Sequence, residues 1–432
     1  MKQLVATARL IVVGLSFAGL ARAAAQDEAQ LQWLVKGVPD PAIIESHDGT
    51  GYYIYATGKG IAIWHSADLK VWKRIGRVFD SEVPLWSKKL VPGSDSVWAP
   101  DIHFVDGQYL LYYSVSTFGS QRSVIGLATN RSLDPKNKNY RWVDQGSVVE
   151  SFPRRNDYNA IDPAFFADDD GTPYLYWGSY WSGLKAASLT QKRFKFSTTT
   201  PEASHVAGRS DRGPTSIEAP YVCKHGGFYY LFVSWDFCCA QENSTYKILV
   251  GRSRKPLGPF VDHQGRPLST GGGKVVLMSD QRWRGPGHNS VLQSKTRGDW
   301  LVYHVVDSDR PEAGRILQLR PLQWKEGWPE LGRPISVKAG TDPSPHKLVG
   351  RWKHMVDQRD QYDIFFEPNG FITGVKGEAQ WTVSGDQLEL RWKDRNAPGG
   401  FWIDRVQLSK NGSSYSGRNQ NGTLIEGRLV QK

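Results

Sequence analysis

Five runs of aromatic and β-branched residues recur along the chain and constrain its fold more than any other feature. They are YYIYAT from 52, YLLYYSV from 109, YLYWGSY from 174, YYLFVSW from 229 and WLVYHVV from 300. A second short apolar run opens 11 or 12 residues before each of them, at 40, 98, 162, 218 and 288. Paired strands at a nearly constant offset, repeated five times with longer variable segments between them, are typical of radially repeated four-stranded sheets.

The repeat predicts an all-β fold, a five-bladed β-propeller over residues 30–336. A β-sandwich with irregular loops is the competing fold. Sandwich strands recur every 8–12 residues or so, whereas the runs here start 55 to 71 residues apart. Long helical periodicity is absent from the region, so we favour the propeller.

A different pattern begins after a segment rich in Gly, Pro and Asp, VKAGTDPSPH from 337. Short alternating runs, separated by Gly, Asn or Asp turns, fill residues 347–432. They are LVGRW, YDIFF, QWTV, LELRW, WIDRVQL and TLIEGRLV. This pattern predicts a small C-terminal antiparallel β-barrel. Such a barrel either binds carbohydrate or braces the propeller, and we favour bracing.

The first 25 residues have the layout of a secretory signal peptide. Basic Lys2 and Arg9 precede an apolar centre at 10–20, and small residues follow up to Ala25. The alternative is a membrane anchor, but a spanning helix needs about 20 apolar residues, more than this run has. We therefore expect a secreted or periplasmic protein with no membrane partner.

Charge and cysteine content restrict the partners further. The formal net charge is +11, but the basic residues are scattered. An exported protein with such a surface suits an acidic cell-wall polysaccharide as well as nucleic acid, and we expect a monomer that binds no nucleic acid.

Three cysteines, Cys223, Cys238 and Cys239, lack metal-ligand spacing. Whether adjacent Cys238 and Cys239 form a disulfide is not decided by the sequence.

The residues that open the five repeats are the candidates for chemistry. The first strand of each propeller blade lines the central channel, so Asp40, Trp98, Asp162, Glu218 and His288 are expected to face one another. A single Asp-Pro step is usually a turn. Three acids in one channel, however, raise one another's pKa and cost stability, which favours a role in proton chemistry or cation binding.

Hydrolysis of a glycosidic bond needs the groups that this channel offers, an acid for the leaving oxygen and a base for water. The residues alone do not assign the acid and base roles. His288 is a structural histidine, a substrate donor or a metal ligand, and its axial position favours the last two. Calcium prefers oxygen ligands, so one imidazole with water would make an unusual site.

Residues 33–335 resemble glycoside hydrolase family 43, and within it the endo-1,5-α-L-arabinanases. Besides the acids, the resemblance rests on segments in the family's order. They are SVWAPDI, YYSVSTFGS, IGLAT, YNAIDP, GSYWSGLK, SIEAPYV, FCCAQENSTYKILVGRS, GGG, GPGHNSV and YHVVD. The C-terminal barrel resembles a module often appended to these enzymes. The implied substrate is arabinan, or arabino-oligosaccharides, of plant cell-wall pectin.

The resemblance also implies residue roles. Asp40 would be the general base, Asp162 a modulator of the acid's pKa and Glu218 the general acid of an inverting mechanism. His288 would hold a calcium ion mainly through water. The residues implied to line arabinose subsites are Trp98, Phe118, Gly119, Asn159, Ala160, Ile161, Ser179, Tyr180 and Trp181. For Trp98 and Phe118, the alternative to stacking on sugar is core packing.

Two positions depart from the family's pattern. Pro39 precedes the first acid where His is common, and Tyr180 stands where Phe is common. Both leave the acids intact but affect subsite detail. The alternatives to endo action are an exo-acting arabinofuranosidase or β-xylosidase on the same fold, and a non-catalytic sugar-binding propeller.

Overall fold

The computed structural model describes residues 35–209, 215–335, 337–339, 348–358, 360–367, 370–384, 387–397, 400–409 and 412–431. The predicted signal peptide, residues 1–25, lies outside these ranges. The chain divides into two compact units, one ending at Ala339 and one beginning at Gly340. Within the described ranges no helix is long and apolar enough to cross a membrane.

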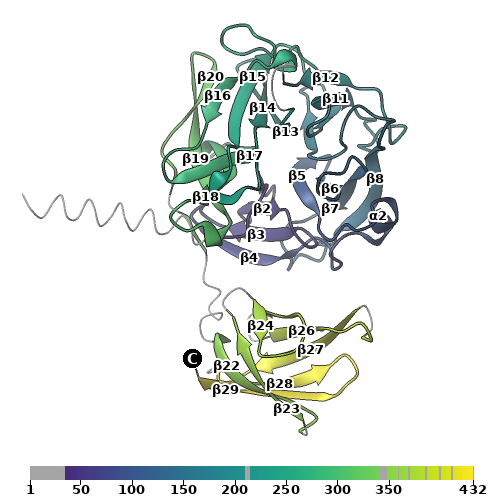
Figure 1. Ribbon diagram of the computed structural model, residues 1–432, viewed down its shortest axis with the longest axis vertical. Helices are drawn as coiled ribbons and strands as arrows, with labels where there is room; N and C mark the ends of the chain where they lie inside the picture. Colours follow the sequence, from purple (N-terminus) through teal and green to yellow (C-terminus); the bar gives the residue numbers. More distant parts are fainter. Residues whose placement is uncertain are drawn as a thin grey trace, which may run out of the picture. The chain divides into compact units, whose positions relative to one another are not determined.

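The first unit is a five-bladed propeller, as the repeat predicts, with its sheets arranged around a central axis (Figure 1). Blade 1 is β1 Ala42–Glu45, β2 Tyr52–Ala56, β3 Ala62–Ser66 and β4 Val71–Arg77. Blade 2 is β5 Trp98–Val105, β6 Gln108–Val115, β7 Ser123–Asn130 and β8 Val143–Ser151. Blade 3 is β9 Ala164–Ala167, β10 Pro173–Trp177, β11 Leu184–Ser188 and β12 Ser204–Ala207. Blade 4 is β13 Ile217–His225, β14 Phe228–Trp235, β15 Lys247–Ser253 and β16 Lys274–Leu277. Blade 5 is β17 Trp283–Ser294, β18 Gly298–Asp307, β19 Arg315–Lys325 and β20 Trp328–Leu331. The short helices are α2 Leu85–Leu90, η1 Gln241–Asn243, η2 Leu268–Thr270 and η3 Pro311–Ala313.

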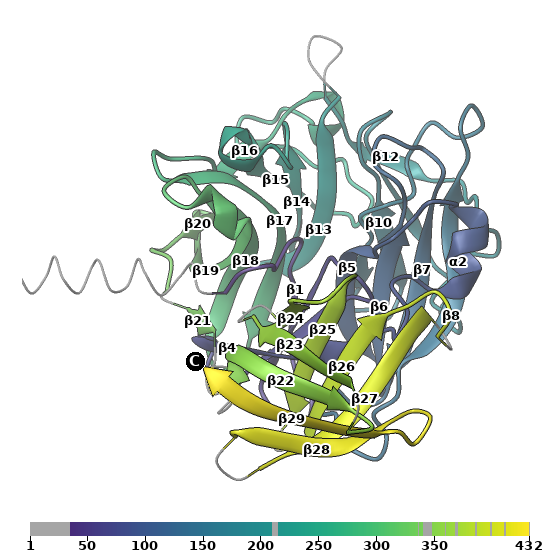
Figure 2. The same cartoon turned by 60° about the horizontal axis from the view of Figure 1, so that its bottom comes forward.

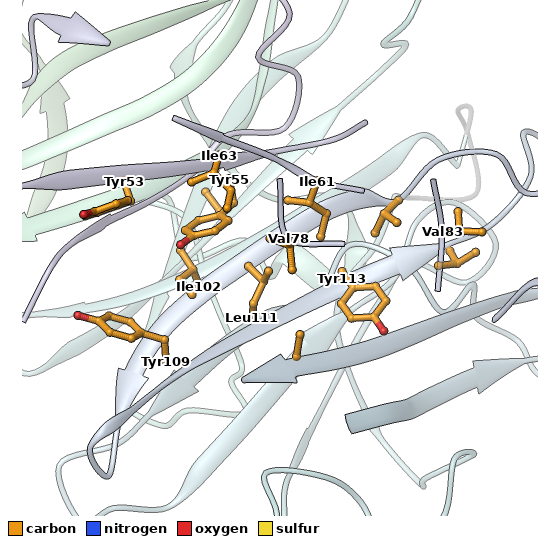
Figure 3. Close-up of a cluster of buried hydrophobic side chains, with 14 of the residues drawn as sticks. Tyr53, Tyr55, Ile61, Ile63, Val78, Val83, Ile102, Tyr109, Leu111 and Tyr113 are labelled. Carbon is orange, nitrogen blue, oxygen red and sulfur yellow. The ribbon is translucent and has the colours of Figure 1, made fainter. Parts of the chain in front are cut away.

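The aromatic runs form the second strand of every blade, β2, β6, β10, β14 and β18. Their side chains fill the space between neighbouring sheets. Between blades 1 and 2, for example, Tyr53 and Tyr55 of β2 pack in one buried cluster with Ile102, Tyr109 and Leu111 (Figure 3). Alternation along a strand sends successive side chains to opposite faces, so one run serves two such interfaces.

The ring closes between the last blade and the first. The segment preceding β1 pairs with β19, where Gly37 donates its backbone N–H to the carbonyl of Arg315 at 3.0 Å. At the outer edge of blade 1, strand β21 Lys338–Ala339 pairs in parallel with β4. The segment predicted to be a linker therefore begins with a strand that adds to the propeller.

The second unit is a closed eight-stranded barrel (Figure 2). Its strands are β22 Gly350–Val356, β23 Asp360–Phe366, β24 Phe371–Thr373, β25 Ala379–Ser384, β26 Gln387–Lys393, β27 Phe401–Leu408, β28 Ser414–Asn419 and β29 Leu424–Gln431. Trp352, Phe366 and Tyr415 stack in its core. Each predicted run forms a strand, and β24 and β28 are two strands that the pattern did not predict.

Candidate active site

One residue next to or within each inner strand has a left-handed backbone conformation; in blade 5 it lies inside β17, which begins at Trp283. These residues are Asp40, Ala99, Asp162, Ala219 and His288, with φ between 45° and 56°. Crowding of the Cβ atom makes this conformation cost roughly 1–2 kcal/mol for residues other than glycine, so its fivefold recurrence marks a shared structural demand. It also corrects the predicted alignment of the blades, because Trp98 and Glu218 stand one residue before the shared position.

A ring of hydrogen bonds explains the demand. At each junction the left-handed residue donates its backbone N–H to a side chain of the preceding blade. The pairs are Asp40 to His304 Nδ1 at 3.1 Å, Ala99 to Thr57 Oγ1 at 2.7 Å, Asp162 to Ser114 Oγ at 2.9 Å, Ala219 to Asp162 Oδ2 at 3.0 Å and His288 to Ser234 Oγ at 2.9 Å. Buried N–H groups need partners, and here the partners tie the five blades to one another around the axis.

A cleft of about 860 Å³ lies at these positions, and nearly all of the predicted site residues line it. The predicted residues that line it are Asp40, Trp98, Phe118, Gly119, Asn159, Ile161, Asp162, Ser179, Tyr180, Trp181, Glu218 and His288. Ala160 is the exception among the predicted residues. It is fully buried in the propeller core, and its N–H donates to Ser151 Oγ at 2.9 Å.

Asp40 lies between groups that favour its anion. Its Oδ1 is 3.4 Å from Nδ1 of both His288 and His304, and Thr57 donates a hydrogen bond to Oδ2. Burial raises the pKa of Asp40, but His288, His304 and Arg315 outweigh burial and hold this pKa well below its usual range. Burial lowers the pKa of His304 to about 4. That ring is therefore neutral at neutral pH, and the permanent positive charge near Asp40 is that of Arg315.

Asp162 experiences the opposite environment. It is buried, and burial together with the negative charges of Glu218 and Asp40 raises its pKa well above the usual range. Glu218 is only partly buried and borders the cleft. Its two oxygens accept hydrogen bonds of 2.7 Å from Tyr246 Oη and Ser179 Oγ. Two hydroxyls therefore fix the orientation of the one carboxyl of this pair that substrate can reach most easily.

The donor set around His288 restricts the metal that the site can hold. Among the described residues, no group of three or more His, Cys, Asp or Glu is arranged to hold a metal. Calcium takes six to eight oxygen ligands, so the protein does not enclose it directly. The adjacent Asn289 is buried, and neither polar atom of its amide has a partner among the described residues, which suits ordered water. The residues thus fit a cation that keeps most of its own water.

Several cleft residues were not predicted from the sequence. Thr57, Tyr246 and Arg315 come from loops or from the third strand of a blade. Thr57 and Tyr246 lie within quoted runs, but no site role was predicted for them. Phe237 and the disulfide between Cys238 and Cys239 also line the cleft. Here a signal existed, because Phe237 follows the start of the aromatic run in blade 4 by about as many residues as Phe118 does in blade 2.

Known proteins are similar to this chain over most of its first unit. Residues 34–329 match the glycosyl hydrolases family 43. The chain is 39 % identical over 303 residues to the extracellular exo-α-(1→5)-L-arabinofuranosidase ArbA of Cellvibrio japonicus, covering 68 % of this chain and 86 % of that protein. It is 37 % identical over 294 residues to the extracellular endo-α-(1→5)-L-arabinanase 1 of Bacillus subtilis, covering 67 % and 86 %. The structure of the Cellvibrio cellulosa α-L-arabinanase complexed with arabinohexaose matches with a TM-score of 0.64 and 37 % identity, covering 69 % of this chain and 96 % of that chain.

Proposed function

The chain belongs to glycosyl hydrolase family 43, and we propose that it cleaves internal α-1,5 bonds of arabinan with inversion of configuration. It is a glycoside hydrolase with arabinanase relatives. The observation that supports the finer proposal is the single cleft in which Asp40 and Asp162 have pKa values displaced in opposite directions beside the accessible carboxyl of Glu218. A general base must be ionised, which the low pKa of Asp40 ensures, and the raised pKa of Asp162 indicates that the neighbouring carboxyls of Asp162 and Glu218 favour holding a proton.

The proposed reaction divides the work among the three acids. Glu218 gives its proton to the glycosidic oxygen as the bond from that oxygen to the anomeric carbon breaks. Asp40 takes a proton from a water molecule, whose oxygen bonds to the anomeric carbon from the opposite face. Asp162 orients substrate and adjusts the proton affinity of the acid. The products together contain the two sugar fragments plus one water.

We also propose that a hydrated calcium ion binds through His288. His288, which lines the cleft, would supply one nitrogen ligand, and water would supply the rest. The ion would supply positive charge on the propeller axis. The ion would not be needed to keep Asp40 ionised, because the positive charge of Arg315 already lowers the pKa of Asp40.

Endo action is favoured by the size of the cleft. A volume of about 860 Å³ is near the upper end of the range for ligand pockets, roughly 300–1,000 Å³, and leaves room for more than one sugar. Exo action is the second candidate, because the relative from Cellvibrio japonicus is named an exo-acting enzyme while the one from Bacillus subtilis is named an endo-acting enzyme.

Product length separates these functions. Purified protein would be incubated with linear 1,5-arabinan, and the products separated by anion-exchange chromatography at early times. A ladder of arabino-oligosaccharides supports endo action, and arabinose alone identifies an exo enzyme. If no reducing ends form, the protein is a sugar-binding propeller and the proposed function is wrong.

Export and oligomeric state complete the proposal. Both relatives are named extracellular, which supports removal of residues 1–25 and secretion or periplasmic export. The mature protein would act as a monomer on arabinan of plant cell-wall pectin. Mass spectrometry of the exported protein gives its N-terminus, and light scattering gives its mass in solution.

A further inference from the structure

Three exposed aromatic side chains border the cleft from equivalent loops. In blades 2, 3 and 4 the loop between the second and third strands carries Phe118, Trp181 and Phe237, which are 88 %, 37 % and 49 % exposed. Each stands seven to nine residues after the start of its blade's aromatic run. Large exposed apolar groups beside a cleft indicate ligand contact. The resemblance accounts for the first two, and Phe237 has no assigned role.

The blade 4 loop also contains the disulfide between Cys238 and Cys239. Cys239 is exposed and Cys238 half-buried, and both line the cleft. Bonded sulfur is polarizable and a poor hydrogen-bonding group. Phe237, Cys238 and Cys239 are consecutive and all line the cleft, and together they are called the 237–239 face.

Neighbouring hydrogen bonds hold this face in place. Ser244 Oγ donates to the carbonyl of Phe237 at 2.7 Å, and Arg315 Nη2 donates to Cys239 Sγ at 2.7 Å. The same loop ends in Tyr246, whose hydroxyl donates to Glu218. The 237–239 face thus has a defined position relative to the acid. Preorganised surfaces bind with less loss of entropy than mobile ones.

We propose that the 237–239 face is a sugar-binding surface, on which a furanose ring of the arabinan chain packs its C–H groups against the disulfide and Phe237. The proposal rests on the proposed arabinanase function and adds a determinant of substrate length. The face makes no direct hydrogen bond to Asp40 or Asp162, and its one link to them is Arg315, whose charge acts on Asp40 in either redox state of Cys239. The contact therefore contributes mainly to binding of the substrate. It should therefore affect KM for longer oligosaccharides more than kcat.

The experiment uses the full chain in a Cys223→Ala background, in which Cys238 and Cys239 are the only cysteines. Cys223 is buried, and burial raises the pKa of its thiol; its removal leaves no third thiol to exchange with the reduced pair. A phosphine and water reduce the disulfide to two thiols, the phosphine becoming its oxide. The variants are Phe237→Ala and the double replacement of Cys238 and Cys239 by Ser. Met278→Ala, at an exposed residue that does not line the cleft, is the matched control.

KM and kcat would be measured for arabino-oligosaccharides of two to six units. We expect reduction, and each variant of the face, to raise KM for the hexaose about 3- to 10-fold, with kcat within about twofold. The disaccharide should be affected less, Met278→Ala should match the parent, and reoxidation should restore the low KM. Circular dichroism checks folding, and the reversible reduction remains informative if the double variant fails to fold.

Other outcomes overturn the inference and separate it from the proposed function. A fall in kcat with unchanged KM would show that the disulfide acts by holding Tyr246 rather than by contacting sugar. If the oxidised parent cleaves the hexaose and no change to the face alters KM, only the sugar-binding role is wrong. If the oxidised parent neither binds nor cleaves arabino-oligosaccharides, the proposed function fails and this inference with it.

Discussion

Asp40 and Asp162 hold equivalent positions on the first and third blades, yet their pKa values move in opposite directions. The difference comes from their neighbours. Asp40 faces two imidazoles and lies near the guanidinium of Arg315. Asp162, by contrast, is buried, and its charged neighbours are the carboxyls of Glu218 and Asp40. One fivefold backbone therefore places identical side chains in environments that favour opposite protonation states. Asp40 is ionised, as the role of base requires, and Asp162 favours a proton beside the proposed acid Glu218.

Replacing Glu218 with Gln tests the assignment of the acid. The amide keeps the shape of the side chain but has no proton to give to a leaving oxygen, so we expect arabinan hydrolysis to fall by roughly 10²- to 10⁴-fold. Aryl glycosides with good leaving groups should lose less. Tyr246→Phe, which removes only a hydrogen bond to Glu218, should be milder. Near-parental arabinan hydrolysis by folded Glu218→Gln protein would contradict the assignment.

Chelation and His288→Ala test the hydrated ion. Because His288 is the only imidazole that borders the cleft among the described residues, we expect either treatment to lower activity and to leave the propeller folded. Added calcium should reactivate the chelated parent and not the variant. Elemental analysis measures the ion, and intact activity in metal-free protein would show that the ion is dispensable.

The sequence predicted that Asp40, Asp162 and Glu218 meet, because each opens a repeat, and all three line one cleft. It also indicated Phe118 and Trp181 through motif resemblance. It did not find His304 or Thr57, because they lie after the first strand of their blades and act through contacts across a blade junction. Such contacts join distant parts of the chain, so the runs that contain Thr57 and His304 do not reveal what these side chains contact.

At the scale of elements, the ring of backbone hydrogen bonds makes each blade depend on the one before it. Ser114 is fully buried and accepts the N–H of Asp162. Ser114→Ala leaves that N–H without a partner, so we expect the free energy of unfolding to fall by about 1–3 kcal/mol. Ser234→Ala, which affects His288, should cost a similar amount.

Urea denaturation would measure both losses, with Ser197→Ala at an exposed position as the control. The control should stay within about 0.5 kcal/mol of the parent. Ser114→Ala should also alter catalysis, because Asp162 is the residue that it releases. A buried alanine variant as stable as the control would show that the ring does not stabilise the propeller.

Strands with a regular pattern of apolar residues were predicted from the sequence, whereas short or irregular strands were not. All five aromatic runs form second strands. By contrast, β24 has only three residues, and β21 lies in a segment whose composition indicates a linker. The one-residue shift in blades 2 and 4 was missed because bulges occur where Trp98 and Glu218 pair. A bulge changes register without changing the apolar pattern.

At the scale of the whole molecule, the two units have separate cores, so pH can affect one without the other. In the barrel, burial raises the pKa of Asp404 from its usual 3.8 to about 6, although Trp392 Nε1 donates a hydrogen bond of 2.6 Å to it. Between about pH 4 and pH 6 the folded barrel therefore binds more protons than the unfolded chain, and this carboxyl lowers stability as the pH rises.

Asp404→Asn removes the titration and keeps an acceptor for Trp392. We expect the stability of the variant relative to the parent to increase by up to about 3 kcal/mol between pH 4 and pH 7, and to level off above that. His354 Nε2 lies 3.7 Å from Asp404 Oδ2, and burial lowers the pKa of His354 to about 4. The change in the difference between about pH 5 and pH 7, where that imidazole is neutral, therefore reports Asp404. Hydrogen exchange of barrel peptides at several pH values measures the difference. A pH-independent difference would show that Asp404 is not forced to hold its proton.

The stereochemistry of the reaction depends on the whole propeller, because Asp40 and Glu218 come from blades 1 and 4, with blade 5 between them (Figure 1). Inverting enzymes separate their two working carboxyls by about 6.5–9.5 Å to admit water, against about 5–5.5 Å in retaining enzymes. Non-adjacent blades favour the wider separation. We therefore expect Asp40→Asn to be inactive and no covalent glycosyl-enzyme to form.

Proton NMR of the first product tests this mechanism before the anomers exchange. An α-linked arabinoside should release the β-anomer first, since water attacks the face opposite the leaving group. Mass spectrometry of the enzyme during turnover should show only its unmodified mass. An initial α-anomer, or a sugar adduct on Asp40, would mean that Asp40 attacks the anomeric carbon directly. The propeller would then hold its two carboxyls closer than their places on non-adjacent blades indicate.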